Sequence, residues 1–163
     1  MPKVIYKTGD DVSTDAIYPG RYMATVLPSE TPQYAFANDV EFNRRLHARE
    51  FPPGSVLVGG RNFGCGSSRE QAASTLKGYD LVIVAEGVAR IFLQNAINLG
   101  LRVVTVPGLQ ASVGDEIELT GDKAVNRTTG RSFDVAPLPK ARQAIIDAGG
   151  LIPYTRRRLA TLP

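Results

Sequence analysis

Apolar residues between positions 55 and 106 fall into short continuous runs, and an amphipathic stretch separates each run from the next. Continuous apolar runs of this length are typical of strands buried on both faces of a parallel sheet. The pattern therefore predicts an α/β unit of strand, helix, strand, helix and strand with right-handed crossovers. The expected strands are 55–60, 80–86 and 101–108, and the expected helices run from Ser67 to Gly78 and from Gly87 to Gly100.

The segment before this unit has a different pattern. Residues 3–7 predict a first strand, and residues 8–23 are so rich in glycine, aspartate, serine and threonine that we expect them to be irregular. Residues 38–50 predict a short helix, with Asn38 as its N-terminal cap.

The segment after the unit alternates polar and apolar residues. Over residues 115–138 the alternation has a period of two between turn signals, which predicts short antiparallel strands. A last helix is expected at 139–150, with Pro139 near its start and Gly149 beyond its end. The basic residues that follow predict a flexible, solvated tail over about 154–163.

Composition and length indicate one globular domain that spans residues 1–163. Of the 163 residues, 43% are hydrophobic and 21% are charged, which excludes a disordered chain. No uncharged apolar run reaches the roughly 18 residues of a membrane span, and the polar N-terminus lacks the apolar segment of a signal peptide. We therefore expect a cytoplasmic protein that does not insert into membranes.

Cysteine and histidine are too few for a metal centre. Cys65 and His47 are the single residues of their types, so the chain can form neither an internal disulfide nor a site of four thiolates. Any iron–sulfur cluster that this protein uses must therefore be held by a partner chain, and we expect no metal in this one.

The formal net charge is +3, and part of the excess lies in the run Arg156–Arg158. A basic interaction protein would bind nucleic acid through this run in a salt-sensitive way. The sequence has no nucleic-acid-binding motif, no tryptophan and no basic segment interleaved with aromatic residues, so we expect no nucleic-acid partner.

The stretch "GRNFGCGSSRE" at 60–70 is the clearest candidate for a site. It has no lysine for a phosphate-binding Walker A loop, no third glycine for a dinucleotide fingerprint and no G-x-S-x-G nucleophile turn. A Cys65 nucleophile would need a histidine, and His47 is the one available.

An anion site remains compatible with this stretch. The backbone amides of Gly64, Cys65 and Gly66 can turn towards an anion, the following helix adds its positive end, and Arg69 adds a planar fork. Alternatively, Ser67 and Glu70 form a capping box and Arg69 pairs with a surface acid. The pattern alone does not choose between these, and a stand-alone anion-binding module would need no catalysis.

Two motifs resemble the small subunits of aconitase-type dehydratases, with those of 3-isopropylmalate dehydratase and homoaconitase nearest. They are "GDDVSTDAIYPGRYM" and "GRNFGCGSSRE" followed by "VIVAEGVARIFLQNAINLGL", and the resemblance extends to about residue 120. It implies a swivelling β/β/α domain of the aconitase C-terminal type. It also implies that the chain is active only with a large subunit, which carries a 4Fe–4S cluster.

The resemblance also assigns roles to residues. It implies that Ser67 is the general base, and that Ser68 and Arg69 grip a substrate carboxylate. Asp15 in "STDA" would assist by pairing with a histidine of the large subunit, although aspartate is also common in plain turns.

Three further positions carry less functional weight. Arg90 and Asn95 also match family positions, and we expect packing or loop support from both. Gln71 stands where the family often has histidine, on the helix rather than in the loop.

In the family, the loop that corresponds to Tyr22, Met23, Ala24 and Thr25 contacts the variable group of the substrate. Ala24 stands where homoaconitase-like members have an arginine for a distal carboxylate, and an unpaired buried carboxylate costs several kcal/mol. The resemblance therefore implies a hydro-lyase that isomerises 2-isopropylmalate to 3-isopropylmalate in leucine biosynthesis. The alternatives are dimethylmalate, methylmalate and, least compatible with Ala24, homocitrate.

Overall fold

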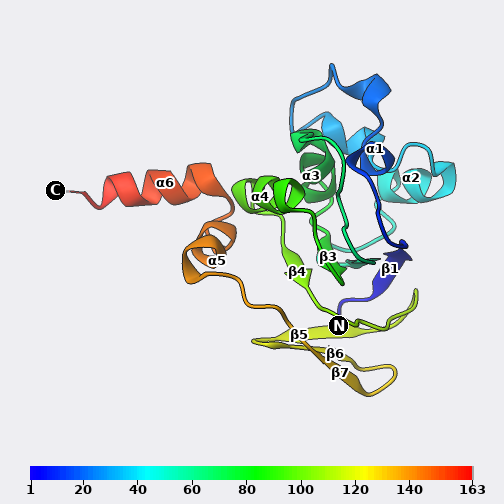
Figure 1. Cartoon of the computed structure of the whole chain (residues 1–163). Helices are drawn as coiled ribbons and strands as arrows, with labels where there is room; N and C mark the ends of the chain where they lie inside the picture. Colours follow the sequence, from blue (N-terminus) through cyan, green and yellow to red (C-terminus); the bar gives the residue numbers. More distant parts are fainter. Residues whose placement is uncertain (163) are drawn as a thin grey trace.

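The computed structural model describes residues 1–162, and its centre is a four-stranded parallel sheet (Figure 1). The strands lie in the order β1-β2-β3-β4. Their bounds are β1 Val4–Lys7, β2 Val56–Gly59, β3 Val82–Ala85 and β4 Val103–Thr105. Every residue of β2 and β3 is buried, which explains why the sequence of these strands is continuously apolar.

The two faces of this sheet bury different partners, because successive side chains of a strand point to opposite faces. Leu57 and Ile83 belong to a core cluster that includes side chains from helices packed on one face of the sheet. Val56 and Val82 belong to a second cluster that includes Ile117 of the other sheet. The helices on the first face are α2 Val40–His47, α3 Glu70–Lys77 and α4 Arg90–Leu99. The result is a layered α/β fold, as predicted (Figure 1).

The second sheet is antiparallel, as the period-two alternation predicted. Its strands, in the order β5-β6-β7, are β5 Ile117–Thr120, β6 Lys123–Asn126 and β7 Arg131–Asp134. The expected helix at 139–150 is α5 Lys140–Asp147, which has Pro139 as its N-cap. No helix within residues 1–162 has the length and apolar character needed to cross a membrane.

Two local predictions were wrong, and one short helix lies where no element was predicted. The segment 8–23 contains two short helices, α1 Thr14–Ile17 and η1 Gly20–Tyr22. The N-cap of α2 is Asp39 rather than Asn38, and its carboxylate accepts a hydrogen bond from the Phe42 amide at 3.0 Å. A further short helix, η2 Thr31–Tyr34, precedes α2.

The capping box was also wrong, because α3 begins at Glu70, three residues after Ser67. Arg69 is the N-cap and makes no capping hydrogen bond with its side chain. The Ser67 hydroxyl lies outside the helix and is therefore available for another contact.

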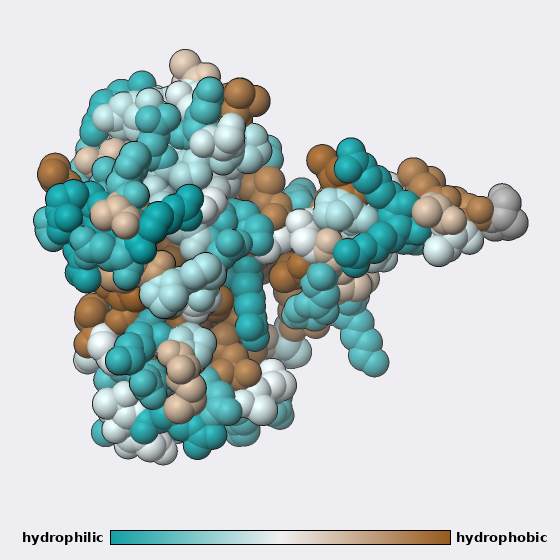
Figure 2. Space-filling model, turned by 180° about the vertical axis from the view of Figure 1, so that it is seen from behind, coloured by the Kyte–Doolittle hydropathy of each residue, from teal (hydrophilic) through white to brown (hydrophobic). Residues whose placement is uncertain are grey.

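The basic segment expected to be a flexible tail is instead helix α6, Leu151–Ala160. None of its residues is buried, and it projects from the rest of the chain (Figures 1 and 2). The last residue of the expected tail, Pro163, lies outside the described residues.

Gly64 is required by both its backbone and its surroundings. Its φ angle is +80°, and a Cβ atom built there would overlap the Phe92 ring. We expect Gly64→Ala to lower the free energy of unfolding by about 3 kcal/mol or more, because left-handed strain and overpacking each cost about 1–3 kcal/mol. Urea unfolding of the isolated chain measures this change.

The matched control is Gly54→Ala. Gly54 has a φ angle of +84°, yet a Cβ atom there would have no neighbour within 4 Å. This variant should show the cost of the backbone conformation alone, about 1 kcal/mol. Equal losses in the two variants would mean that the Phe92 contact is easily relieved.

Candidate functional site

The two motifs lie side by side at one edge of the parallel sheet. Strands β1 and β2 are parallel neighbours, so the segments that follow them leave the sheet at the same end. The Gly64 amide donates to the Val12 carbonyl at 2.7 Å, and the Thr14 amide donates to the Cys65 carbonyl at 2.8 Å. Residues more than 50 positions apart thus form one continuous surface, in which Ser13 and Cys65 make an isolated parallel bridge.

One ion pair and one polar pair join the same two segments closer to the sheet. Arg61 donates to both oxygens of Asp10, with its backbone N–H at 2.8 Å from Oδ1 and its Nη2 at 2.8 Å from Oδ2. These hydrogen bonds lower the pKa of Asp10 below its ordinary value. Asn62 donates to Asp11 at 2.9 Å. These pairs were not predicted from the sequence, although a polar dipeptide follows each of the two strands and was a possible signal.

Ser67 lies on the exposed rim of this surface. Its Oγ is 3.1 Å from Oγ1 of Thr14, a buried hydroxyl that also donates to the Ser67 carbonyl at 3.2 Å. Ser68 is exposed beside it, and the Asn95 side chain donates to the Ser68 carbonyl at 3.2 Å. The support expected of Asn95 is thus confirmed, whereas Thr14 was missed because a threonine in a turn-rich segment carries no distinctive pattern.

Arg69 and Asp15 form an ion pair beside these serines. The Arg69 Nη1 lies 2.6 Å from Asp15 Oδ1 and also donates to the Tyr18 carbonyl at 3.2 Å. The Arg69 side chain is 16% exposed and the Asp15 side chain 61%. Nε of Arg69 is buried and has no hydrogen-bond partner among the described residues. The arginine is therefore largely enclosed while its partner carboxylate remains accessible.

Asp15 is held by the backbone as well. The Gly20 amide donates to the same Oδ1 at 2.8 Å, and a Cβ atom at Gly20 would lie 3.1 Å from Arg69 Nη2 and 3.2 Å from Asp15 Oδ1. The hydrogen bond from Arg69, followed by that from Gly20, lowers the pKa of Asp15 below its ordinary value. Asp15 is thus a carboxylate, and the pair is fully charged, at neutral pH.

The Asp15–Arg69 ion pair predicts how the stability of the folded chain depends on pH. Because the pKa of Asp15 is lower in the folded chain, the stabilising contribution of the ion pair is present above the ordinary aspartate pKa of about 3.9. It is lost as the pH falls through the lowered value. In Arg69→Gln we expect the pKa of Asp15 to rise towards the ordinary value, as followed by an NMR titration of its carboxyl carbon.

Arg21 supplies the matched control for this titration. It lowers the pKa of Asp15 by charge alone and less than Arg69 does. Arg21→Gln should therefore produce the smaller rise, and an equal rise in the two variants would contradict the direct pair.

The segment Tyr22–Thr25 begins with the last residue of η1, two positions after Gly20. The Tyr22 ring stacks on Tyr34 with centroids 4.0 Å apart, whereas Met23 is 49% exposed and Ala24 is also exposed. Met23 and Ala24 thus present exposed apolar side chains a few residues after Gly20, whose amide binds Asp15. Arg90, at the start of α4, is exposed.

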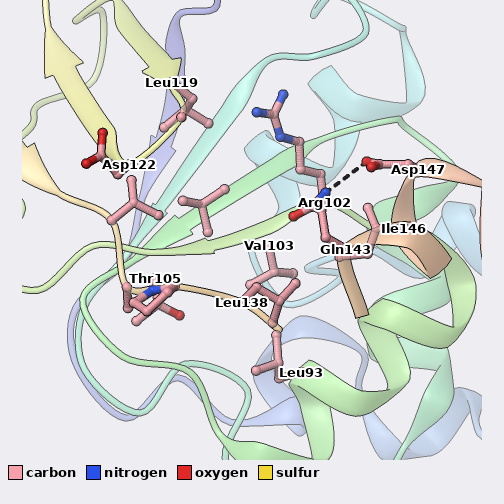
Figure 3. Close-up of a pocket in the computed structure, with 15 residues that line it drawn as sticks. Leu93, Arg102, Val103, Thr105, Leu119, Asp122, Leu138, Gln143, Ile146 and Asp147 are labelled. Carbon is pink, nitrogen blue, oxygen red and sulfur yellow. Dashed lines mark hydrogen bonds between the residues drawn. The ribbon is translucent and has the colours of Figure 1, made fainter. Parts of the chain in front are cut away.

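The predicted site is an open rim rather than a closed cavity. A groove of about 750 Å³ lies elsewhere, between β4, the β5–β6 turn and α5 (Figure 3). Leu93, Val103 and Ile146 contribute to its walls, and none of the predicted site residues lines it.

The described residues include no group of three or more histidine, cysteine, aspartate or glutamate side chains that could hold a metal ion. Cys65 is a free, partly exposed thiol in the glycine loop. Since a 4Fe–4S cluster needs several thiolates, this donor set does not fit one. The rim can therefore offer hydroxyls, an arginine and a carboxylate to a ligand held from the other side.

Comparison with known proteins found one matching family model and several close relatives. The model of the aconitase C-terminal domain matches residues 30–108. The isopropylmalate/citramalate isomerase small subunit of Methanocaldococcus jannaschii is 41% identical, over 96% of this chain and 94% of the relative. The 3-isopropylmalate dehydratase small subunit of Thermodesulfovibrio yellowstonii is 38% identical over the same shares. A crystal structure of 3-isopropylmalate dehydratase from M. jannaschii has a TM-score of 0.85 and 34% identity, and covers 97% of this chain and 94% of that one.

Proposed function

The chain belongs to the family of 3-isopropylmalate dehydratase small subunits, and from this premise we propose that it completes a hydro-lyase that isomerises 2-isopropylmalate to 3-isopropylmalate. This reaction is a step of leucine biosynthesis. The observation that carries the proposal is the rim at which Ser67, Arg69 and Asp15 meet, from motifs more than 50 residues apart. An exposed rim of this kind requires a second surface to enclose a substrate.

In this proposal, Ser67 removes the proton next to a substrate carboxylate. A serine hydroxyl has far too high an intrinsic pKa for this role unless its alkoxide is stabilised. The Gly64 amide already donates to the Val12 carbonyl at 2.7 Å, which corrects the expectation that it faces an anion. The amides of Cys65 and Gly66 in the same loop, and the Thr14 hydroxyl 3.1 Å from Oγ, are the groups that would support the alkoxide, with the Thr14 proton turned from the Ser67 carbonyl to Oγ. Positioned dipoles that act on a developing charge are a major source of catalysis.

Arg69, with Ser68, holds the carboxylate so that the proton faces Ser67. Arginine suits this task because a guanidinium makes strong, charge-assisted hydrogen bonds to carboxylates. In the described chain Nη1 is engaged by Asp15 and Tyr18 and Nε is buried, so Nη2 is the nitrogen left for the substrate, and the orientation of the side chain is set before substrate binds. Such preorganisation lowers the entropy cost of reaching the reactive geometry.

Asp15 serves two partners in the proposal. Its Oδ1 accepts from Arg69 and Gly20, which leaves Oδ2 for a histidine of the large subunit. The large subunit would also carry the 4Fe–4S cluster, which supplies a Lewis acid for the departing hydroxyl group. The small subunit would swivel as a domain to cap that site, in a heterodimer or heterotetramer in the cytoplasm.

The substrate carries an alkyl group in this proposal, because Met23 and Ala24 offer an apolar surface without a cation. Citramalate, which is 2-methylmalate, is the second candidate, since a relative 41% identical is named an isopropylmalate/citramalate isomerase small subunit. Dimethylmalate would fit the same surface, and homocitrate would leave its distal carboxylate unpaired.

Anaerobic co-purification tests the proposal. The tagged chain is recovered from its native extract, and the eluate is assayed with 2-isopropylmalate, citramalate and homocitrate. We expect an iron–sulfur chain to co-purify, and the pair to convert the alkyl malates in preference to homocitrate. A chain that is recovered alone and binds anions without turnover would instead support an anion-binding module.

A further inference from the structure

We propose that Tyr18 and Gln71 are positioning residues that fix the distance between Arg69 and the segment Tyr22–Thr25. They would thereby set the size of substituent that the enzyme accepts. This inference rests on the proposed function, in which Arg69 holds a substrate carboxylate and the segment meets the alkyl group. On the sequence alone, Gln71 carried little functional weight and Tyr18 did not stand out.

Tyr18 is bonded to both parts of the site. Its carbonyl accepts from Arg69 Nη1 at 3.2 Å, while its hydroxyl lies 3.1 Å from the Tyr22 carbonyl and 3.3 Å from the Thr25 carbonyl. The residue is completely buried, and burial raises the pKa of its hydroxyl above the ordinary value of about 10. The hydroxyl therefore keeps its single proton, which it shares between the Tyr22 and Thr25 carbonyls at the two ends of the segment.

Aromatic packing holds the Tyr18 ring in this orientation. Tyr34 contacts Tyr18 edge-to-face, with centroids 6.0 Å apart, and stacks on Tyr22 at 4.0 Å. Rings in these arrangements attract each other beyond the effect of burial. The three tyrosines thus form one packed group that includes Tyr22, the first residue of the segment.

Gln71 makes an independent hydrogen bond to the segment. It lies in the first turn of α3, two residues after Arg69, and its Nε2 donates to the Met23 carbonyl at 3.2 Å. Carbonyls of three of the four residues in the segment are therefore engaged by Tyr18, which is hydrogen-bonded to Arg69, or by Gln71, which is two residues from it. A shift of the segment relative to Arg69 would break these hydrogen bonds.

The consequence concerns selectivity rather than proton transfer. If Arg69 fixes the carboxylate end of a malate, the position of Met23 and Ala24 decides how much room its substituent has. A larger substituent depends more on that contact, so loosening the segment should cost isopropylmalate more than citramalate. A loss of general stability would instead affect both substrates alike.

The test compares Tyr18→Phe and Gln71→Leu in complex with the large subunit. We expect each variant to lower the ratio of kcat/KM for isopropylmalate to that for citramalate about fivefold, as the loss of one neutral hydrogen bond predicts. The change should lie mainly in KM for isopropylmalate. Hydrogen exchange of the Thr25 amide, which donates to the Tyr22 carbonyl at 3.0 Å, should become faster in both variants.

Tyr34→Phe is the matched control, because it removes a hydroxyl from the same aromatic group but one that makes no hydrogen bond among the described residues. It should leave both the substrate ratio and the Thr25 exchange rate unchanged. The inference would be overturned by an unchanged substrate ratio in Tyr18→Phe and Gln71→Leu, or by an equal change of this ratio in Tyr34→Phe. In either case an active wild-type complex would still support the proposed function. If the wild-type complex converts neither malate, the proposed function is wrong. Unchanged hydrogen exchange of the Thr25 amide in Tyr18→Phe and Gln71→Leu would then also reject their role in positioning the segment.

Discussion

Ser67→Ala should reduce kcat of the complex about a thousandfold, because a positioned general base contributes about 10²–10⁴ in rate. The structure explains why the substitution should slow the chemical step without unfolding the chain. Ser67 is exposed, lies outside helix α3, and its hydroxyl is bonded only to Thr14 among the described residues. Thr14 keeps the Ser67 carbonyl as an acceptor at 3.2 Å when that hydroxyl is removed.

The measurement is steady-state kinetics with 3-isopropylmalate, together with urea unfolding of the isolated chain. The free energy of unfolding should change by less than about 1 kcal/mol, since exposed substitutions rarely do more. Ser132→Ala, which removes an exposed hydroxyl from β7, is the control and should retain full activity. If Ser67→Ala kept activity within tenfold of the wild type, another group would have to be the base.

The second large effect is expected for Arg69→Lys, which should lower kcat/KM about a hundredfold, or about 2.7 kcal/mol. Lysine keeps the positive charge but presents it as a single point, without the fork that binds a carboxylate through two parallel bonds. Arg69 also contacts Asp15 and the Tyr18 carbonyl while being 16% exposed. A single ammonium group is not expected to reproduce these contacts and also bind substrate.

The loss should lie largely in KM, because the missing interaction is made in the ground state as well as in the transition state. Arg44→Lys is the control, since Arg44 also forms a two-bond pair, with Glu41 at 3.1 and 2.9 Å, but on the exposed surface of α2. Such surface pairs contribute about 0–1 kcal/mol, and activity should be unaffected. Near-normal KM in Arg69→Lys would indicate that charge alone suffices at the site.

The order of the main elements was predictable because local patterns determine it. The apolar runs at 55–60 and 80–86 are buried on both sides in β2 and β3, and Gly100 ends α4 in the left-handed conformation that glycine favours. The period-two alternation after residue 115 likewise identified β5, β6 and β7. In these segments, the local secondary-structure propensity and the pattern of buried positions predict the same element.

Helix ends and the C-terminal segment were less predictable, because several polar residues compete for each position. Ser67 and Glu70 have the spacing of a capping box, yet Ser67 is drawn towards Thr14, a partner 53 positions away in the sequence. The basic segment was read as a tail because its charges resemble those of solvated chains, although Leu151–Ala160 form a helix that stays exposed.

The sequence by itself determined the layered α/β class, the family and the chemical types of the site residues, because strand periodicity and motif composition are local properties of the chain. Only the tertiary structure decided that Asp15 pairs with Arg69, that Thr14 supports Ser67, and that Tyr18 and Gln71 hold the segment Tyr22–Thr25. Those contacts depend on β1 and β2 being parallel neighbours, so that segments distant in the sequence leave the sheet at one edge. Side chains that meet through long-range pairing leave no spacing pattern along the chain from which their partners could be read.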